Sequence, residues 1–155
     1  MNLGSPGDRT EHVLHRLSIE DMTKPISNAK NVVIMIGTNN VGVGDAVDAV
    51  FNGVVAVVTK VREKFNSKVH VILLSILPRA SVGLTATIEA INKKLENKYE
   101  GHEKVHYLNI FDKFVDSSKK ANHKMFMPDH VHPSANAYEY IISAIKPLLD
   151  GKYPR

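Results

Sequence analysis

Three short apolar runs in this chain alternate with longer segments in which apolar residues recur every third or fourth position. The runs span Asn31 to Ile36, Val69 to Leu77 and Val105 to Ile110, and the first two are almost continuously apolar and rich in branched residues. Such runs predict strands that are covered on both faces, which is typical of a parallel sheet lying between helices.

The longer periodic segments predict four helices. These helices span Asp8 to Leu17, Asp45 to Phe65, Thr85 to Tyr99, and Ser134 to Leu149. Asp8 suits the N-cap of the first helix, and Gly53 either weakens the second helix locally or allows a close approach to it. The polar segments 18–30 and 111–124 are predicted to be connections.

This order of elements predicts one α/β domain over residues 1–155, with a parallel sheet and right-handed crossovers. In such sheets the chemistry gathers at the carboxyl ends of the strands. Two polar segments are placed to reach that edge: Gly37 to Asn40, directly after the first strand, and Asp129 to His132, just before the last helix.

Composition excludes several classes of function. The lysines are scattered rather than gathered in a basic stripe, and the net charge is only +4, so no nucleic-acid partner is expected. No apolar run approaches the roughly 18 residues that a membrane span needs. The chain has no cysteine, which excludes disulfides and thiolate zinc sites and fits a reducing compartment, so a cytoplasmic location is expected.

Asp129 and His132 have the spacing of an acid–base pair. A carboxylate three residues before a histidine can accept a hydrogen bond from Nδ1–H, fix the tautomer and leave Nε2 free to act as a base. The alternative is a loop whose polar residues cap the next helix. His130 and His132 could also bind a metal, but no further cluster of ligands accompanies them, so no metal site is expected.

Two other segments could stabilise a negative charge. An asparagine amide in Gly37 to Asn40 can donate to a developing oxyanion, although this segment is also typical of a simple turn. The glycine-bearing segment 2–8 precedes a helix and offers free backbone N–H groups that suit an anion. The alternative for segment 2–8 is an unstructured N-terminus.

Taken together, these segments resemble the SGNH (GDSL-type) hydrolases. The resemblance lies in the glycine loop around Gly7, in Gly37-Thr38-Asn39-Asn40 after a buried strand, and in Asp129-x-x-His132-Pro133 before the last helix, in this order. The closer match is to the catalytic subunits of platelet-activating-factor acetylhydrolase type Ib, to which the stretches 7–17, 36–40, 77–79 and 137–138 are similar.

The resemblance implies a three-layer α/β/α, flavodoxin-like fold and hydrolysis of short-acyl carboxylic esters through an acyl-enzyme, without cofactor or metal. It implies that the backbone N–H of Gly7 and the side-chain amide of Asn39 bind the oxyanion. His132 would be the general base and then the general acid, and Asp129 would orient it. The substrate would be a small-molecule or lipid ester.

The resemblance also implies two substrate-binding positions and a nucleophile. Thr38 and Val131 match positions near the acyl pocket. In the family the nucleophile is the serine of a Gly-Asp-Ser block that ends a strand upstream of the glycine loop, and the printed sequence shows no such block. None of its serines, Ser5 and Ser75 included, sits on a strand-to-helix elbow, so we expect none of them to be the nucleophile.

The family's first strand lies beside the strand that corresponds to Asn31 to Ile36, so this strand is expected to be an open edge, which is a template for pairing. We expect that the sequence is part of a longer protein, that an N-terminal segment associates with it, or that two copies pair as a dimer. The alternative function is a catalytically inactive binding or dimerisation module with the same fold, and a third interpretation is an α/β domain with chance motifs.

Overall fold

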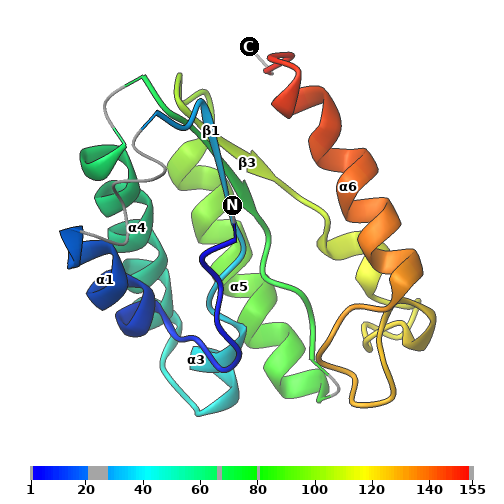
Figure 1. Cartoon of the computed structure of the whole chain (residues 1–155). Coiled ribbons are helices and arrows are strands. Elements are labelled where there is room, and N and C mark those ends of the chain that lie inside the picture. Colours follow the sequence, from blue (N-terminus) through cyan, green and yellow to red (C-terminus); the bar gives the residue numbers. More distant parts are fainter. Residues whose placement is uncertain (1, 21–27, 66–67, 80, 154–155) are drawn as a thin grey trace.

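The computed structural model describes residues 2–20, 28–65, 68–79 and 81–153, and it shows a parallel sheet with helices on both faces (Figure 1). The strands are β1 (Asn31–Ile34), β2 (His70–Leu74) and β3 (Val105–Leu108), in the order β1-β2-β3. The predicted parallel sheet is therefore confirmed. In the register of the first pair, Val33 lies opposite Ile72.

The described helices are α1 (Thr10–Ser18), α3 (Thr38–Gly42), α4 (Val47–Lys64), α5 (Val82–Tyr99) and α6 (Ala135–Leu149), with 3-10 turns η2 (Phe111–Phe114) and η3 (His123–Met125). The predicted strands were too long at their carboxyl ends. Ile76, Leu77 and Ile110 lie beyond the paired residues and are nevertheless buried. Burial alone does not show where the ladder ends.

One local prediction and one of the alternatives were wrong. Asp8 is not the N-cap of α1, which is Arg9, because the Asp8 carboxylate instead binds Arg16. The segment after β1 is not a simple turn but opens α3, with Gly37 at the N-cap and φ of 117°. A Cβ on Gly37 would lie 2.7 Å from Ile76 Cδ1, so glycine is required for both backbone conformation and space. Residues 21–27 of the predicted connection lie outside the described residues.

The alternating side chains of β2 divide the core into two parts. Val71 and Leu73 pack with α1, α4 and α5 on one face of the sheet. Ile72 and Leu74 pack with α6 and the 3-10 turns on the other face. Each face of β2 is therefore covered, as its continuously apolar sequence predicts.

The α6 face of β1 is not covered in the same way. Val33 and Met35 are 40% and 41% exposed, whereas Ile72, the register partner of Val33, is fully buried. On α6, Tyr138 and Ile142 are also more than half exposed, although both are among the apolar residues whose helical spacing predicts this helix. The apolar side of α6 is therefore wider than the surface that the described residues cover.

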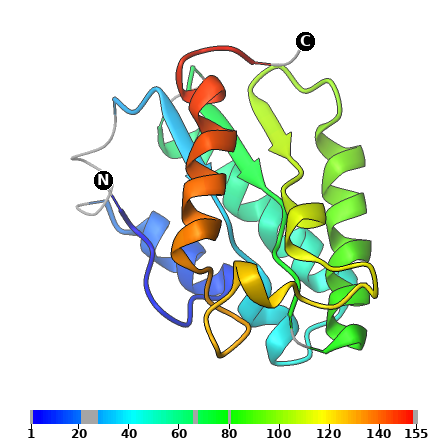
Figure 2. The ribbon, with the colours of Figure 1, turned by 90° about the vertical axis from the view of Figure 1, so that its right-hand side faces the viewer.

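The exposed flank of α6 faces toward β1. Tyr140 on the opposite flank packs against Phe114 of η2, which follows β3. Helical spacing places Tyr138 and Ile142 on the other flank of the helix, and Figure 2 shows β1 and η2 on opposite sides of α6. We call the exposed apolar residues on this side the β1–α6 strip; they are Val33, Met35, Tyr138, Ile142 and Leu149.

α1 and α4 lie unusually close where Gly53 meets Thr10. A Cβ on Gly53 would be 2.5 Å from Thr10 Oγ1, which is too short for any carbon–oxygen contact. Of the two readings of Gly53, the close approach is therefore the correct one. This approach fixes the start of α1, and with it the loop that precedes α1, against the core.

The segment after α6 is fixed at the amino ends of the strands. The ring of Tyr153 stacks on the imidazoles of His70 and His106, with centroids 3.8 and 4.3 Å away. Its hydroxyl donates to Asn31 Oδ1 at 2.6 Å. His70 Nδ1 and His106 Nε2 are 2.9 Å apart, so at least one of these rings is neutral, because one nitrogen must accept the hydrogen.

Candidate active site

The predicted site segments lie at the end of the molecule where the strands have their carboxyl ends. Figures 1 and 2 show the loop before α1, helix α3 and the loop before α6 at this same end. Asn39 lies on α3, which follows β1, and Asp129 and His132 lie in the chain between η3 and α6.

Asp129 and His132 are joined directly. Asp129 Oδ2 lies 2.7 Å from His132 Nδ1, and Asp129 Oδ1 accepts the backbone N–H groups of Val131 and His132, both at 2.9 Å. The helix N-cap is Ser134, whose hydroxyl accepts the N–H of Ala137. The alternative in which Asp129 and His132 only cap the helix is therefore wrong.

The loop that carries this pair is tightly closed. Met127 N–H donates to the carbonyl of His132 at 2.8 Å, and Phe126 pairs with Pro133. His130, at the tip, has φ of 53°, a left-handed conformation that is uncommon for a residue with a side chain. The closed loop holds the carboxylate and the imidazole together before any ligand binds.

Hydrogen bonds determine the charge of Asp129. The His132 ring and the two backbone N–H groups lower the pKa of Asp129 far below its usual range. The carboxylate is therefore ionised at neutral pH, where it accepts the Nδ1 hydrogen of His132 and leaves the Nε2 lone pair to accept a proton. The side chain of His132 is 72% exposed, so Nε2 is accessible to a reacting group.

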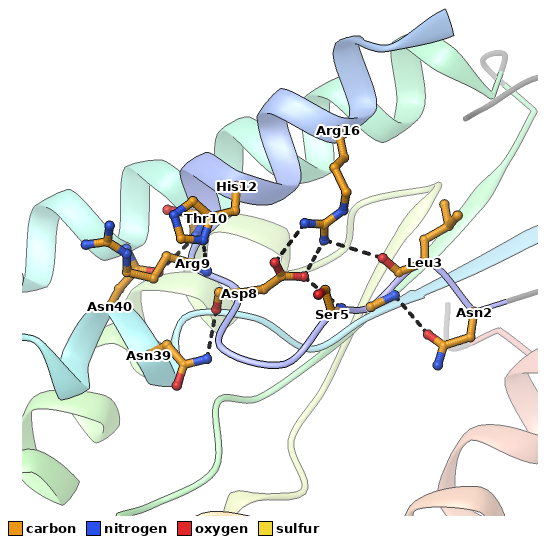
Figure 3. A network of polar contacts seen from close by, with 11 residues as sticks. Asn2, Leu3, Ser5, Asp8, Arg9, Thr10, His12, Arg16, Asn39 and Asn40 are labelled. Atoms are coloured by element: carbon orange, nitrogen blue, oxygen red, sulfur yellow. Dashed lines mark hydrogen bonds and ion pairs between the residues drawn. The ribbon is translucent and has the colours of Figure 1, made fainter. Parts of the chain in front are cut away.

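The loop before α1 is ordered, and Asn39 contacts it (Figure 3). Asn39 Nδ2 donates to the backbone carbonyl of Asp8 at 2.9 Å, next to Gly7. The amide nitrogen carries two hydrogens, so one holds the loop while the other can donate to a ligand. The alternative of an unstructured segment 2–8 is wrong, and the structure brings Gly7 and Asn39 together.

Asp8 and Arg16 form the ion pair that orders this loop. Arg16 Nη1 donates to Asp8 Oδ1 at 2.7 Å, and Nη2 binds Oδ2. This bidentate bond lowers the pKa of the Asp8 carboxyl below its usual range. Sequence reasoning missed the pair, because an arginine on the polar side of a helix is most often a solvated surface residue.

Asn40 and Arg79 are also parts of the site that sequence reasoning missed. Asn40 is buried, accepts the N–H of Thr10 at 3.0 Å and donates to Asp45 at 2.8 Å, so it joins α1 to α3. Arg79 donates to the carbonyl of Thr38 at 2.9 Å and packs against α3. Arg79 was visible in the sequence only as part of a stretch that matched the resembled subgroup.

The two predicted substrate-binding residues belong to the same two segments. Thr38 begins α3 and its hydroxyl contacts Arg79 at 3.3 Å. Val131 follows Asp129 and is partly exposed. Their part in binding an acyl group stays a prediction.

The described serines that sequence reasoning considered are engaged elsewhere. Ser75 is fully buried and accepts the N–H of Ile110, and Ser134 caps α6. Ser5 lies in the exposed loop, where its N–H binds the Asp8 carboxylate. In the described part of the chain none of these three hydroxyls is hydrogen bonded to His132.

A cavity of about 410 Å³ lies away from these residues, between α5 and the outer edge of β3. It is lined by polar and aromatic residues such as Glu96, His106 and Tyr107, and none of the predicted site residues lines it. Among the described residues there is no group of three or more His, Asp or Glu side chains arranged to hold a metal ion. Of the described helices, none combines the length and apolar character that crossing a bilayer requires.

A comparison with known families identifies the family of this chain. The model of the GDSL-like lipase/acylhydrolase family matches residues 1–140. The chain belongs to this family. Its members are hydrolases of the serine esterase type, which agrees with the joined Asp129–His132 pair and with the predicted oxyanion-binding role of Asn39 at the same sheet edge.

Relatives of this GDSL-like chain agree in sequence and in fold. It is 31% identical over 151 residues to platelet-activating factor acetylhydrolase IB subunit alpha1 of Pongo abelii. The match covers 96% of this chain and 63% of that protein. The Homo sapiens subunit gives the same values. The chain thus spans less than two thirds of the length of these curated relatives.

A solved structure of a GDSL-like lipase from Bacteroides thetaiotaomicron has the same fold. It superposes with a TM-score of 0.77 at 22% identity, covering 94% of this chain and 72% of that one. The α/β arrangement of a three-stranded parallel sheet and its helices therefore matches the structures of the family.

Proposed function

We propose that this chain supplies the acid–base pair and the oxyanion-binding groups of an ester hydrolase that acts on short-acyl carboxylic esters, without a metal or cofactor. The observation that carries the proposal is the hydrogen bond between Asp129 and His132, with Nε2 of His132 exposed at the sheet edge where Asn39 contacts the Gly7 loop. Membership of a family of lipases and acylhydrolases supports ester chemistry.

In the proposed reaction a serine hydroxyl attacks the ester carbonyl while His132 Nε2 takes its proton. The oxyanion that forms accepts hydrogen bonds from the Gly7 N–H and from the second N–H of Asn39. His132 then gives the proton to the leaving alcohol, and an acyl-enzyme remains. Water attacks this acyl group with His132 again as the base. Asp129 keeps the imidazole oriented throughout and stabilises its charged form.

The serine in this scheme belongs to a strand–helix unit that is not among the described residues. A strand that pairs in parallel with the open edge of β1 ends at the same sheet edge as β1, so a residue after its last position reaches the site. The helix that follows such a strand must return over one face of the sheet. The β1–α6 strip offers an uncovered apolar surface for this helix.

Completion by this unit would give the three-layer, flavodoxin-like arrangement, with a second helix beside α6. The unit would come from the same polypeptide or from an associated one. A second copy of the chain, paired edge to edge through β1, is the competing occupant of the same surface. Both occupants predict burial of the β1–α6 strip, but only the strand–helix unit delivers a serine.

The test is hydrolysis of p-nitrophenyl acetate by this chain and by a fusion in which the serine-bearing N-terminal block of the Homo sapiens alpha1 subunit precedes it. We expect hydrolysis by the fusion. His132→Ala should lower kcat by about 10²- to 10⁴-fold, as expected for loss of a general base. Asn39→Ala should lower it by about 10²- to 10³-fold, as expected for loss of one oxyanion donor. His123→Ala, which removes an exposed histidine of η3, is the matched control and should change little.

Two results would change this conclusion. If the chain alone hydrolyses the ester and His132→Ala abolishes this activity, one of its own serines is the nucleophile, and Ser5→Ala and Ser75→Ala would show which. If the folded fusion is inactive, the catalytically inactive binding or dimerisation module is the better description.

A further inference from the structure

The chain before α1 makes a type II β-turn at Ser5-Pro6-Gly7-Asp8. The N–H of Asp8 donates to the carbonyl of Ser5 at 3.3 Å, which closes the turn. Gly7, the third residue, has φ of +76°. The proline ring holds φ of the second residue near −65°, which excludes the two mirror-image turns, and the positive φ of Gly7 excludes type I.

The turn type decides which way the N–H of Gly7 points. Types I and II differ by about 150° in ψ of the second residue and by about 170° in φ of the third. These changes rotate the peptide plane between Pro6 and Gly7 while the path of the chain stays almost the same. The Gly7 N–H therefore points to opposite sides in the two forms. A Cβ on Gly7 would meet nothing within 4 Å, so only conformation requires glycine here.

The side chains of Asp8 and Arg16 hold the turn in this conformation. The Asp8 carboxylate accepts the N–H of Ser5 at 2.9 Å, so both ends of the turn are bonded to each other twice. The same carboxylate is held by both terminal nitrogens of Arg16, and Nη2 of Arg16 also donates to the carbonyl of Leu3 at 3.4 Å. Figure 3 shows Arg16 reaching from α1 to these groups.

Arg16 is attached to a rigid part of the protein. Leu17, the next residue, is buried in the core, and α1 meets α4 at the close contact of Gly53. On the opposite side of the turn, Asn39 donates to the carbonyl of Asp8. Asp8 thus connects both oxyanion-binding groups, because its carboxylate fixes the Gly7 turn and its carbonyl fixes the Asn39 amide.

We infer that Asp8 and Arg16 are positioning residues of the oxyanion site, which hold the turn in the type II form and thereby aim the Gly7 N–H and the Asn39 amide at one point. This inference rests on the proposed function, since it assigns a purpose to the same site. Neither side chain touches the substrate. A bidentate ion pair suits this purpose, because arginine holds a carboxylate in one plane and at one angle, which lysine cannot do.

The first experiment needs no activity and uses the chain as it is. In a type II turn the Hα of Pro6 lies close to the amide hydrogen of Gly7, which gives a strong NOE, whereas a type I turn gives a weak one. We expect a strong NOE in the wild type and its loss in Arg16→Lys and Asp8→Asn. Arg9→Gln is the matched control, because Arg9 pairs with the exposed Glu11 and should leave the NOE intact.

Persistence of the NOE in both folded variants, with amide spectra otherwise like the wild type, would overturn the inference. If Arg16→Lys does not fold, Asp8→Asn decides alone, since it keeps the shape of the side chain and removes the charge and one of the two acceptor oxygens.

The second experiment measures the consequence in the serine-bearing fusion. Arg16→Lys should lower kcat by up to about 10²- to 10³-fold, the effect of losing one oxyanion donor, while KM and the unfolding midpoint stay unchanged. A loss of kcat that only follows a lowered unfolding midpoint would indicate a structural role and contradict positioning. An inactive fusion would refute the proposed function, but the NOE would still test the turn.

Discussion

Ile142 on α6 offers the sharpest test of whether a strand–helix unit covers the β1–α6 strip. Its side chain is 59% exposed, whereas that of its neighbour Ile141 is 6% exposed. Full burial of such a side chain contributes about 1.5–3 kcal/mol. Covering the exposed part of Ile142 would therefore contribute about 1–2 kcal/mol to binding of the unit, by proportion to the exposed fraction.

Two measurements on the Ile142→Ala variant separate stability from binding. In urea unfolding of the chain alone, Ile142→Ala should cost less than about 1 kcal/mol, whereas Ile141→Ala should cost about 2–5 kcal/mol, because it leaves a cavity in the core. The second measurement is binding of a labelled peptide that contains the serine-bearing strand and helix of the Homo sapiens alpha1 subunit. Ile142→Ala should weaken this binding about 5- to 30-fold, because about 1.4 kcal/mol of binding free energy corresponds to a factor of ten in Kd.

Val82→Ala is the matched control for binding, because Val82 is an exposed apolar residue on α5, away from the strip. It should leave the Kd of the peptide unchanged. An unchanged Kd in Ile142→Ala, or an equal loss in both variants, would show that the unit does not pack on α6. The dimer would be favoured by a different result, in which the chain binds no peptide but associates with itself, and Ile142→Ala weakens this self-association.

Two further predictions concern stability. Gly53→Ala should destabilise the chain by up to about 2 kcal/mol in urea unfolding, because overpacking against α1 costs about 1–3 kcal/mol and the gain in helix propensity of about 1 kcal/mol offsets part of this cost. Gly83→Ala in α5, where a Cβ meets nothing closer than 3.8 Å, should instead be neutral or stabilising. Burial lowers the pKa of His70 and of His106 in the folded chain. As the pH falls through the ordinary histidine pKa of about 6.5, the unfolded chain therefore binds more protons than the folded chain. The free energy of unfolding should therefore be highest above that pH and decrease as the pH falls through it, and a pH-independent value would contradict this.

The candidate site was predictable where chemistry depends on spacing along the chain. Asp129 and His132 are three residues apart, and a short closed loop brings such a pair together without help from distant segments. Asn39 was predictable because it follows a buried strand, and the end of a parallel strand is where a site forms. In Gly37 to Asn40 the position after a strand does not separate the two asparagines, and only the family resemblance selected Asn39. Only the start of α3 places Asn39 on the Gly7 loop and Asn40 in the buried contact with α1.

The parts of the site that were missed depend on residues far apart in the sequence. No local pattern indicates a partner for Arg16, and its partner Asp8 was predicted to be an N-cap. Their bond exists because the chain turns back at Gly7 and α1 is held against α4. Arg79 reaches Thr38 across 41 positions, a contact that no local pattern indicates.

By itself, the sequence determined the alternation of strands and helices, the parallel sheet and the acid–base loop, because hydrophobic period and short-range spacing act locally. Tertiary structure alone decided which apolar residues are covered. Val33 and Ile72 look alike in sequence, yet only Ile72 is buried, because α6 lies over β2 and the described residues leave the same face of β1 uncovered. An apolar pattern shows that a side chain can be buried, but only the arrangement of neighbouring elements shows whether it is.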